Sequence, residues 1–63
     1  MLIFVKRMVE EEKDLKGKIK RAEDFLNTNV RISKTERELL EEQIKYMKQY
    51  LEVLRKRLDL YKE

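Results

Sequence analysis

Residues 33–61 read SKTERELLEEQIKYMKQYLEVLRKRLDLY, and this stretch decides the fold. Its apolar residues recur at alternating intervals of four and three, with no Gly or Pro between them: Leu40, Ile44, Met47, Leu51, Leu54, Leu58 and Tyr61. This spacing predicts one long amphipathic helix with coiled-coil periodicity. The four residues from Ser33 to Glu36 have the pattern of a capping box. In this motif the Ser33 hydroxyl accepts a hydrogen bond from the Glu36 amide, and the Glu36 carboxylate accepts one from the Ser33 amide. We therefore expect a helix over about 34–62.

A second apolar stripe runs beside this seam on the same helix. It consists of Leu39, Tyr46, Val53 and Leu60, with Tyr50 between the two stripes. At about 100° per residue the two stripes merge into an arc roughly 160° wide, which is more than one partner helix covers. We therefore expect the second stripe to form the interface of a homo-oligomer. A lesser alternative is that Tyr46 and Tyr50 wall a ligand pocket between subunits.

A shorter periodic segment lies nearer the N-terminus and predicts a first helix over about 2–27: Val5, Met8, Glu12, Leu15, Ile19, Ala22 and Leu26. The following turn, 28–33, is polar, and the Asn residues around it tolerate the left-handed conformation of a helix C-terminus. A short connection between amphipathic helices makes an antiparallel hairpin. Six layers pair without a slip: Ala22–Leu40, Ile19–Ile44, Leu15–Met47, Glu12–Leu51, Met8–Leu54 and Val5–Leu58.

The sequence thus predicts one all-α domain over residues 1–63, a two-helix hairpin that assembles into an oligomeric helical bundle. The competing interpretation is a single helix of about 60 residues in a parallel coiled coil. The polar break and the capping box both disfavour it. A chain of 63 residues buries little surface alone, so self-association is the remaining way to gain a core in the absence of disulfides.

The composition restricts the chemistry. The chain has no Cys and no His, which removes thiolate nucleophiles, the usual zinc ligands and the usual near-neutral general base. No Gly-rich phosphate loop or nucleophile–base pair is present, so we expect no catalytic residue, no metal site, no cofactor and no enzyme activity.

The charge pattern restricts the partners. Charged residues make up 46% of the chain at a net charge of only +3, with acids and bases interleaved, and this pattern disfavours nucleic-acid binding. The apolar run at residues 1–5 is too short for a signal sequence or a membrane span, so we expect a cytoplasmic protein.

One polar residue, Glu12, interrupts the first seam. In one interpretation its carboxylate reaches out of the hairpin edge and sets the register, as single polar residues do in coiled coils. In the other it pairs across an oligomer interface with a basic residue such as Arg55 or Lys48, because a buried charge needs a partner.

A basic cluster forms the candidate ligand site. The antiparallel register brings Lys6 and Arg7 near Arg55 and Arg57, with Tyr61 close by. Guanidinium and ammonium groups hold phosphate, and an aromatic ring stacks on a base. The alternative is that these cations complement the dipole at the helix C-terminus. Arg57, at the margin of the apolar arc, is equally suited to an interface ion pair.

A family resemblance adds a functional expectation. The second helix carries Glu38-Leu39-Leu40-Glu41-Glu42-Gln43, then Met47, Tyr50, Leu54 and Arg57, after a first helix with Glu11-Glu12-Lys13-Asp14-Leu15 and Phe25-Leu26. This pattern resembles a family of very small phage and prophage proteins first named from crAss-like phages. The architecture is also similar to phage anti-defence hairpin proteins, the oligomeric sponges of immune signals.

The resemblance implies counter-defence in the cytoplasm of a host cell. The protein would sequester a cyclic-nucleotide or ADP-ribose-type signal, with phosphate on the basic cluster and a base stacked on Tyr46, Tyr50 or Tyr61. The alternative is an inhibitor or adaptor whose second stripe docks on a host defence protein.

Overall fold

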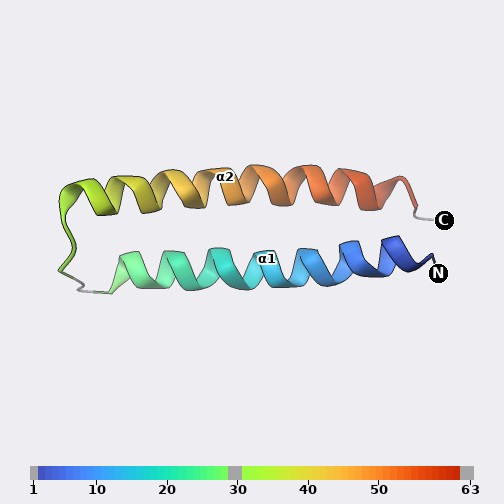
Figure 1. Cartoon of the computed structure of the whole chain (residues 1–63), viewed down its shortest axis with the longest axis horizontal. Helices are drawn as coiled ribbons and strands as arrows, with labels where there is room; N and C mark the ends of the chain where they lie inside the picture. Colours follow the sequence, from blue (N-terminus) through green and yellow to red (C-terminus); the bar gives the residue numbers. More distant parts are fainter. Residues whose placement is uncertain (1, 29–30, 62–63) are drawn as a thin grey trace.

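The computed structural model describes residues 2–28 and 31–61 and contains two antiparallel helices. Helix α1 spans Ile3–Asn27 and helix α2 spans Lys34–Asp59. They lie side by side, with the connecting turn at one end and both chain ends at the other (Figure 1). The predicted hairpin is confirmed, and the single long helix is excluded.

Helix α1 begins without a side-chain cap. Its first turn is closed by the carbonyl of Leu2, which accepts from the amides of Val5 and Lys6 at 3.1 Å each. At the other end Thr28 adopts an extended backbone, and its hydroxyl donates to the Phe25 carbonyl at 2.7 Å. The expected left-handed residue is not found among the described residues, none of which has a positive φ, and Asn29 lies outside them.

Helix α2 begins at the predicted cap. The Ser33 hydroxyl accepts from the Glu36 amide at 3.0 Å, but the reciprocal bond from the Ser33 amide to the exposed Glu36 carboxylate is not formed within the described segments. The Arg37 guanidinium also donates to the Leu26 carbonyl at 3.5 Å, which links the start of α2 to the last turn of α1. The last regular residue of α2 is Asp59, three residues earlier than expected; residues 62 and 63 are not described.

The core is a single row of side chains between the two helices. The buried residues are Met8, Leu15, Ile19, Ile44, Leu51 and Leu54. Four of them form one cluster, against which Ala22, Leu26, Leu40 and Met47 pack. Both members of the three predicted layers nearest the turn therefore belong to the same core.

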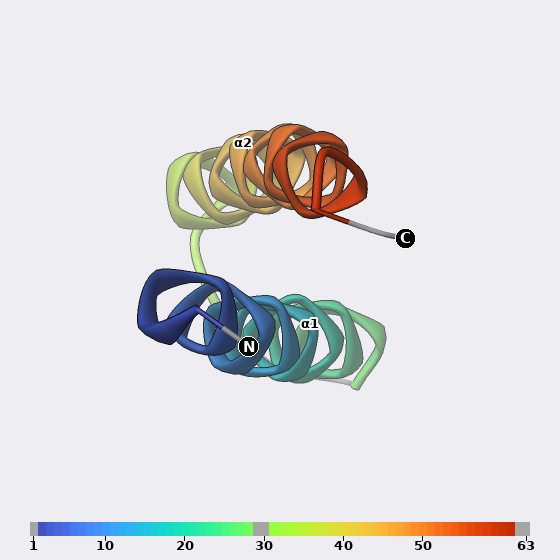
Figure 2. The same cartoon turned by 90° about the vertical axis from the view of Figure 1, so that its right-hand side faces the viewer.

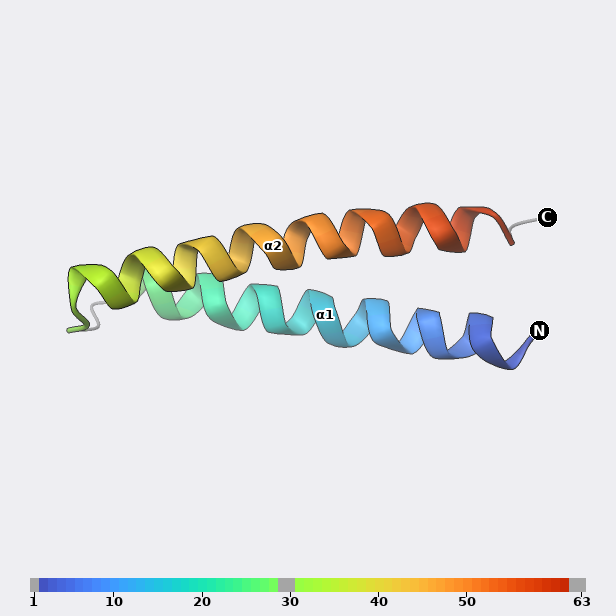
Figure 3. The same ribbon diagram turned by 45° about the horizontal axis from the view of Figure 1, so that its top comes forward.

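The hairpin is long and thin. Its principal extents are 46 × 15 × 15 Å. The end-on view shows one helix above the other with no third layer, and the oblique view shows the helices slightly inclined to one another (Figures 2 and 3). A two-helix layer leaves the outward face of each helix open to solvent.

The second stripe of α2 lies on such an open face. All five residues expected at an oligomer interface are exposed in the single chain: Leu39, Tyr46, Tyr50, Val53 and Leu60. This confirms that α1 does not cover the stripe. Contiguous exposed apolar surface of this kind is typical of an interaction site.

Candidate ligand-binding site

A groove of about 570 Å³ lies between the helices at the open end of the hairpin. It is lined by Val5, Val9 and Glu12 from α1, by Arg55, Leu58 and Asp59 from α2, and by Tyr61 just beyond α2. We call it the end groove. Three aliphatic side chains, three charged groups and one phenol give it the mixed character of small-molecule sites.

Arg55 is the cation of the end groove. Its Nε lies 3.5 Å from Glu12 Oε2, and Glu12 Oε1 lies 3.8 Å from Lys16 Nζ. The side chain of Glu12 is 20% exposed and that of Arg55 is 50% exposed. The guanidinium is thus held on one side by Glu12 while the other side remains open to water, where a ligand can reach it.

Glu12 corrects one sequence-based interpretation. One of the two interpretations paired it with Arg55 across an oligomer interface, but the two residues meet within one chain. Lys48 likewise pairs inside the hairpin, with its Nζ 2.8 Å from Glu23 Oε2. The reason is geometric: both pairs lie along the same edge between α1 and α2, so long side chains reach across without a second copy.

Tyr61 is held in place by an aromatic neighbour. Its ring meets that of Phe4 edge to face, with centroids 5.1 Å apart and an interplanar angle of 78°. This is a favourable aromatic geometry, and it joins the start of α1 to the end of α2. The ring of Tyr61 therefore borders the end groove from a supported position.

The structure brings only two of the five predicted ligand residues together. Arg55 and Tyr61 line the end groove, whereas Lys6, Arg7 and Arg57 are exposed and do not line it. At about 100° per residue, Arg57 points away from Arg55 on α2, and Arg7 points away from Val5 and Val9 on α1, although all lie at the same end of the hairpin.

Two acidic groups of the groove were not predicted. Asp59 lies one turn after Arg55 on the same edge of α2, and Glu12 faces Arg55 from α1. The i,i+4 spacing of Arg55 and Asp59 was the signal available in the sequence. The groove therefore contains both charge signs, and it offers hydrogen-bond acceptors as well as a cation.

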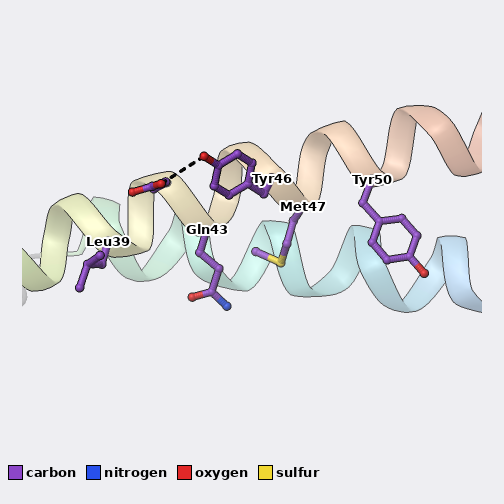
Figure 4. A pocket seen from close by; sticks show the side chains of 6 residues that line it. Leu39, Gln43, Tyr46, Met47 and Tyr50 are labelled. Atoms are coloured by element: carbon purple, nitrogen blue, oxygen red, sulfur yellow. Dashed lines mark hydrogen bonds between the residues drawn. The ribbon is translucent and has the colours of Figure 1, made fainter.

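A second groove, of about 420 Å³, lies on the outer face of α2. Its lining comes from that helix alone: Leu39, Glu42, Gln43, Tyr46, Met47 and Tyr50 (Figure 4). The Tyr46 hydroxyl donates to Glu42 Oε1 at 3.1 Å. This hydrogen bond and the adjacent negative charge raise the pKa of Tyr46 above 10.0. Since the groove is open and almost entirely apolar, it resembles half of an interface more than a finished ligand site.

The described residues form neither a metal-binding cluster nor a membrane span. Among residues 2–28 and 31–61, no group of three acidic side chains is arranged to hold a metal ion. Over the same ranges, neither helix combines the length and the apolar character that a membrane span needs.

The comparisons with known proteins identify the family. No curated protein and no solved structure matches the chain significantly. One family model does match, that of Sequestin, and its match covers residues 3–60. These residues include both helices, the turn and every side chain of the two grooves except Tyr61. The chain therefore belongs to the Sequestin family.

Proposed function

We propose that this protein is a non-enzymatic counter-defence protein of a phage or prophage, which sequesters a nucleotide-derived immune signal in the host cytoplasm. The name of its family, Sequestin, indicates the sequestration of a molecule and a binding role. The nucleotide-type ligand and the oligomer are parts of the proposal. The same holds for the phage setting, which rests on the sequence resemblance.

The observation that carries the proposal is the end groove, where a half-exposed guanidinium and a supported aromatic ring border one cavity. Arg55 can fork onto phosphate oxygens through the nitrogens that Glu12 leaves open. The Tyr61 ring offers a face for a base, since every base has a π-face that stacks on aromatic side chains.

The carboxylates of the end groove suit the remaining part of a nucleotide. Glu12 and Asp59 accept hydrogen bonds, and the donors of a nucleotide are its sugar hydroxyls and the amino groups of its base. The groove therefore favours a ligand that has both phosphate and hydroxyl or amino groups, such as a cyclic dinucleotide or a cyclic ADP-ribose.

The test is a calorimetric titration of cyclic dinucleotides and cyclic ADP-ribose into the wild type and into Arg55→Gln. We expect one ligand class to bind the wild type and to bind the variant about tenfold more weakly or worse, as for the loss of a charge-assisted contact. Lys56→Gln is the matched control, because Lys56 pairs with Glu52 outside the end groove and should leave affinity unchanged.

Two further readouts make the outcome unambiguous. Circular dichroism of Arg55→Gln should show wild-type helicity, and ligand recovered after heat denaturation should have an unchanged mass, as sequestration requires. Equal affinity in both proteins would place the site elsewhere. No binding of any nucleotide to the wild type, or a chemically altered ligand, would overturn the proposal.

The second candidate function is inhibition of a host defence protein by direct docking. The exposed second stripe favours it, since an amphipathic helix with an uncovered apolar face can lie in the groove of a larger protein. Under this hypothesis Arg55→Gln would retain counter-defence activity in infected cells, whereas Tyr46→Glu would abolish it.

A further inference from the structure

The exposed residues of α2 form more than an apolar patch, because they recur at regular intervals along the helix. Seven exposed residues continue the 4-3 periodicity without a break, and we call them the outer seam: Leu39, Gln43, Tyr46, Tyr50, Val53, Arg57 and Leu60. The backbone of Leu60 is still right-handed helical, with φ −64° and ψ −20°, so its side chain keeps the helical phase. The outer seam is a second coiled-coil surface on a helix whose first seam already packs on α1.

The outer seam is nearly palindromic about the point between Gln49 and Tyr50. Tyr46 and Val53 lie symmetrically about this point, and so do Leu39 and Leu60. Reversing a 4-3 repeat gives a 3-4 repeat, and such a pair of patterns interlocks in antiparallel coiled coils. The surface is thus self-complementary, as an isologous two-fold interface requires.

We propose that a second copy of this chain docks on the outer seam, with the two α2 helices antiparallel and the two-fold axis between Gln49 and Tyr50. Leu39 then lies opposite Leu60 of the second copy, and Tyr46 lies opposite Val53. The seam is about 30 Å long at 1.5 Å per residue. The proposed function includes an oligomer, and this interface specifies how two copies of the chain would pack in it. The interface can be tested without a ligand.

The charges of the outer seam select this orientation. Glu42, whose carboxylate lies at the edge of the seam beside the Tyr46 hydroxyl, falls opposite Arg57 of the second copy, and the symmetry makes this pair twice. In the described part of the chain Arg57 has no side-chain ion pair of its own. A parallel arrangement would instead set Glu42 against Glu42 and Arg57 against Arg57, and like charges repel across an interface.

A charge exchange tests the interface. Glu42→Arg alone should face Arg57, and Arg57→Glu alone should face Glu42, so each variant should self-associate about tenfold more weakly or worse. An equimolar mixture of the two variants should restore the wild-type assembly, because both contacts of the mixed dimer are again opposite in charge. Sedimentation velocity gives the readout, and circular dichroism confirms that each variant remains helical.

The matched control is Lys45→Glu, an equal charge reversal at an exposed position of α2 outside the outer seam, which should assemble like the wild type. Unchanged assembly of both single variants would overturn the proposal, as would the absence of recovery on mixing. If the charge variants assemble normally but nucleotide still binds, the interface is wrong and the end groove remains the ligand site. The two hypotheses can therefore be tested separately.

Cysteine cross-linking provides a second, geometric test, since the chain has no native Cys. Tyr50→Cys lies beside the proposed axis and should form a disulfide-linked dimer on mild oxidation. Leu39→Cys should not, because antiparallel packing keeps the two Leu39 positions about 30 Å apart, far beyond disulfide reach. Efficient cross-linking of Leu39→Cys would show a parallel dimer, and cross-linking of neither would exclude this face.

Discussion

Leu54 is the most deeply buried side chain of the hairpin, with 1% of its surface exposed. Met8 is buried too, and neither residue belongs to the main cluster. Glu12, a seam position of α1, reaches out to Arg55 rather than into the core. At the residue scale, one charged residue thus interrupts the apolar seam of α1 between Met8 and Leu15.

Replacing Leu54 by Ala should lower the free energy of unfolding by about 2–5 kcal/mol, as for other buried Leu truncations. Such a loss removes much or all of the stability of a 63-residue domain. Urea denaturation followed by circular dichroism measures it. Leu2→Ala is the control, since Leu2 is 57% exposed and its truncation should cost within about 0.5 kcal/mol. Equal losses in both variants would contradict this view of the core.

The two helices differ in how they begin. Helix α2 has a side-chain cap in Ser33, while α1 begins at Leu2, which supplies only its backbone carbonyl. The Ser33 cap, together with the bond from Arg37 to the Leu26 carbonyl, sets where the chain reverses. At the element scale the turn is defined by the start of α2 more than by the end of α1.

Ser33→Ala should destabilise the protein by about 1 kcal/mol, because the Glu36 amide loses its side-chain acceptor. The measurement is the midpoint of thermal unfolding by circular dichroism. Thr35→Ala is the matched control, since Thr35 is an exposed residue in the first turn of α2 that caps nothing in the described chain. If Thr35→Ala were as strongly destabilised as Ser33→Ala, the Ser33 cap would make no specific contribution to stability.

At the scale of the whole molecule, two helices in one layer cannot enclose all of their apolar residues. Ten large apolar or aromatic side chains of the described segments are exposed, and five of them are the residues expected at the oligomer interface. The hairpin has a length of 46 Å against a thickness of 15 Å, so little of any side chain lies far from solvent. A second copy is the simplest way to remove this surface from water.

The melting temperature of the wild type should accordingly rise with protein concentration across the micromolar range, because association stabilises the folded state by mass action. Tyr46→Glu, which places a charge in the second stripe beside Glu42, should lower the melting temperature and flatten its concentration dependence. A wild-type melting temperature that is independent of concentration would contradict the expected oligomer.

Much of the fold could be predicted from the sequence because its signals are local. The 4-3 spacing from Leu40 to Tyr61 and the Ser33 cap depend only on the helical period and on neighbouring residues. The candidate site was predicted less well. Arg55 and Tyr61 were assigned correctly to one end of the hairpin, but their groove partners Val9 and Asp59 were not identified.

The sequence by itself determined two amphipathic helices, their antiparallel order, the core positions and the stripe that α1 leaves uncovered. Only the tertiary structure decided which charged groups meet, as in the pairing of Glu12 with Arg55 inside one chain, and which residues enclose the end groove. The physical reason is that periodicity specifies the direction of each side chain around its own helix axis. The contacts of long side chains depend in addition on the stagger and inclination of the two helices, which arise only when they pack.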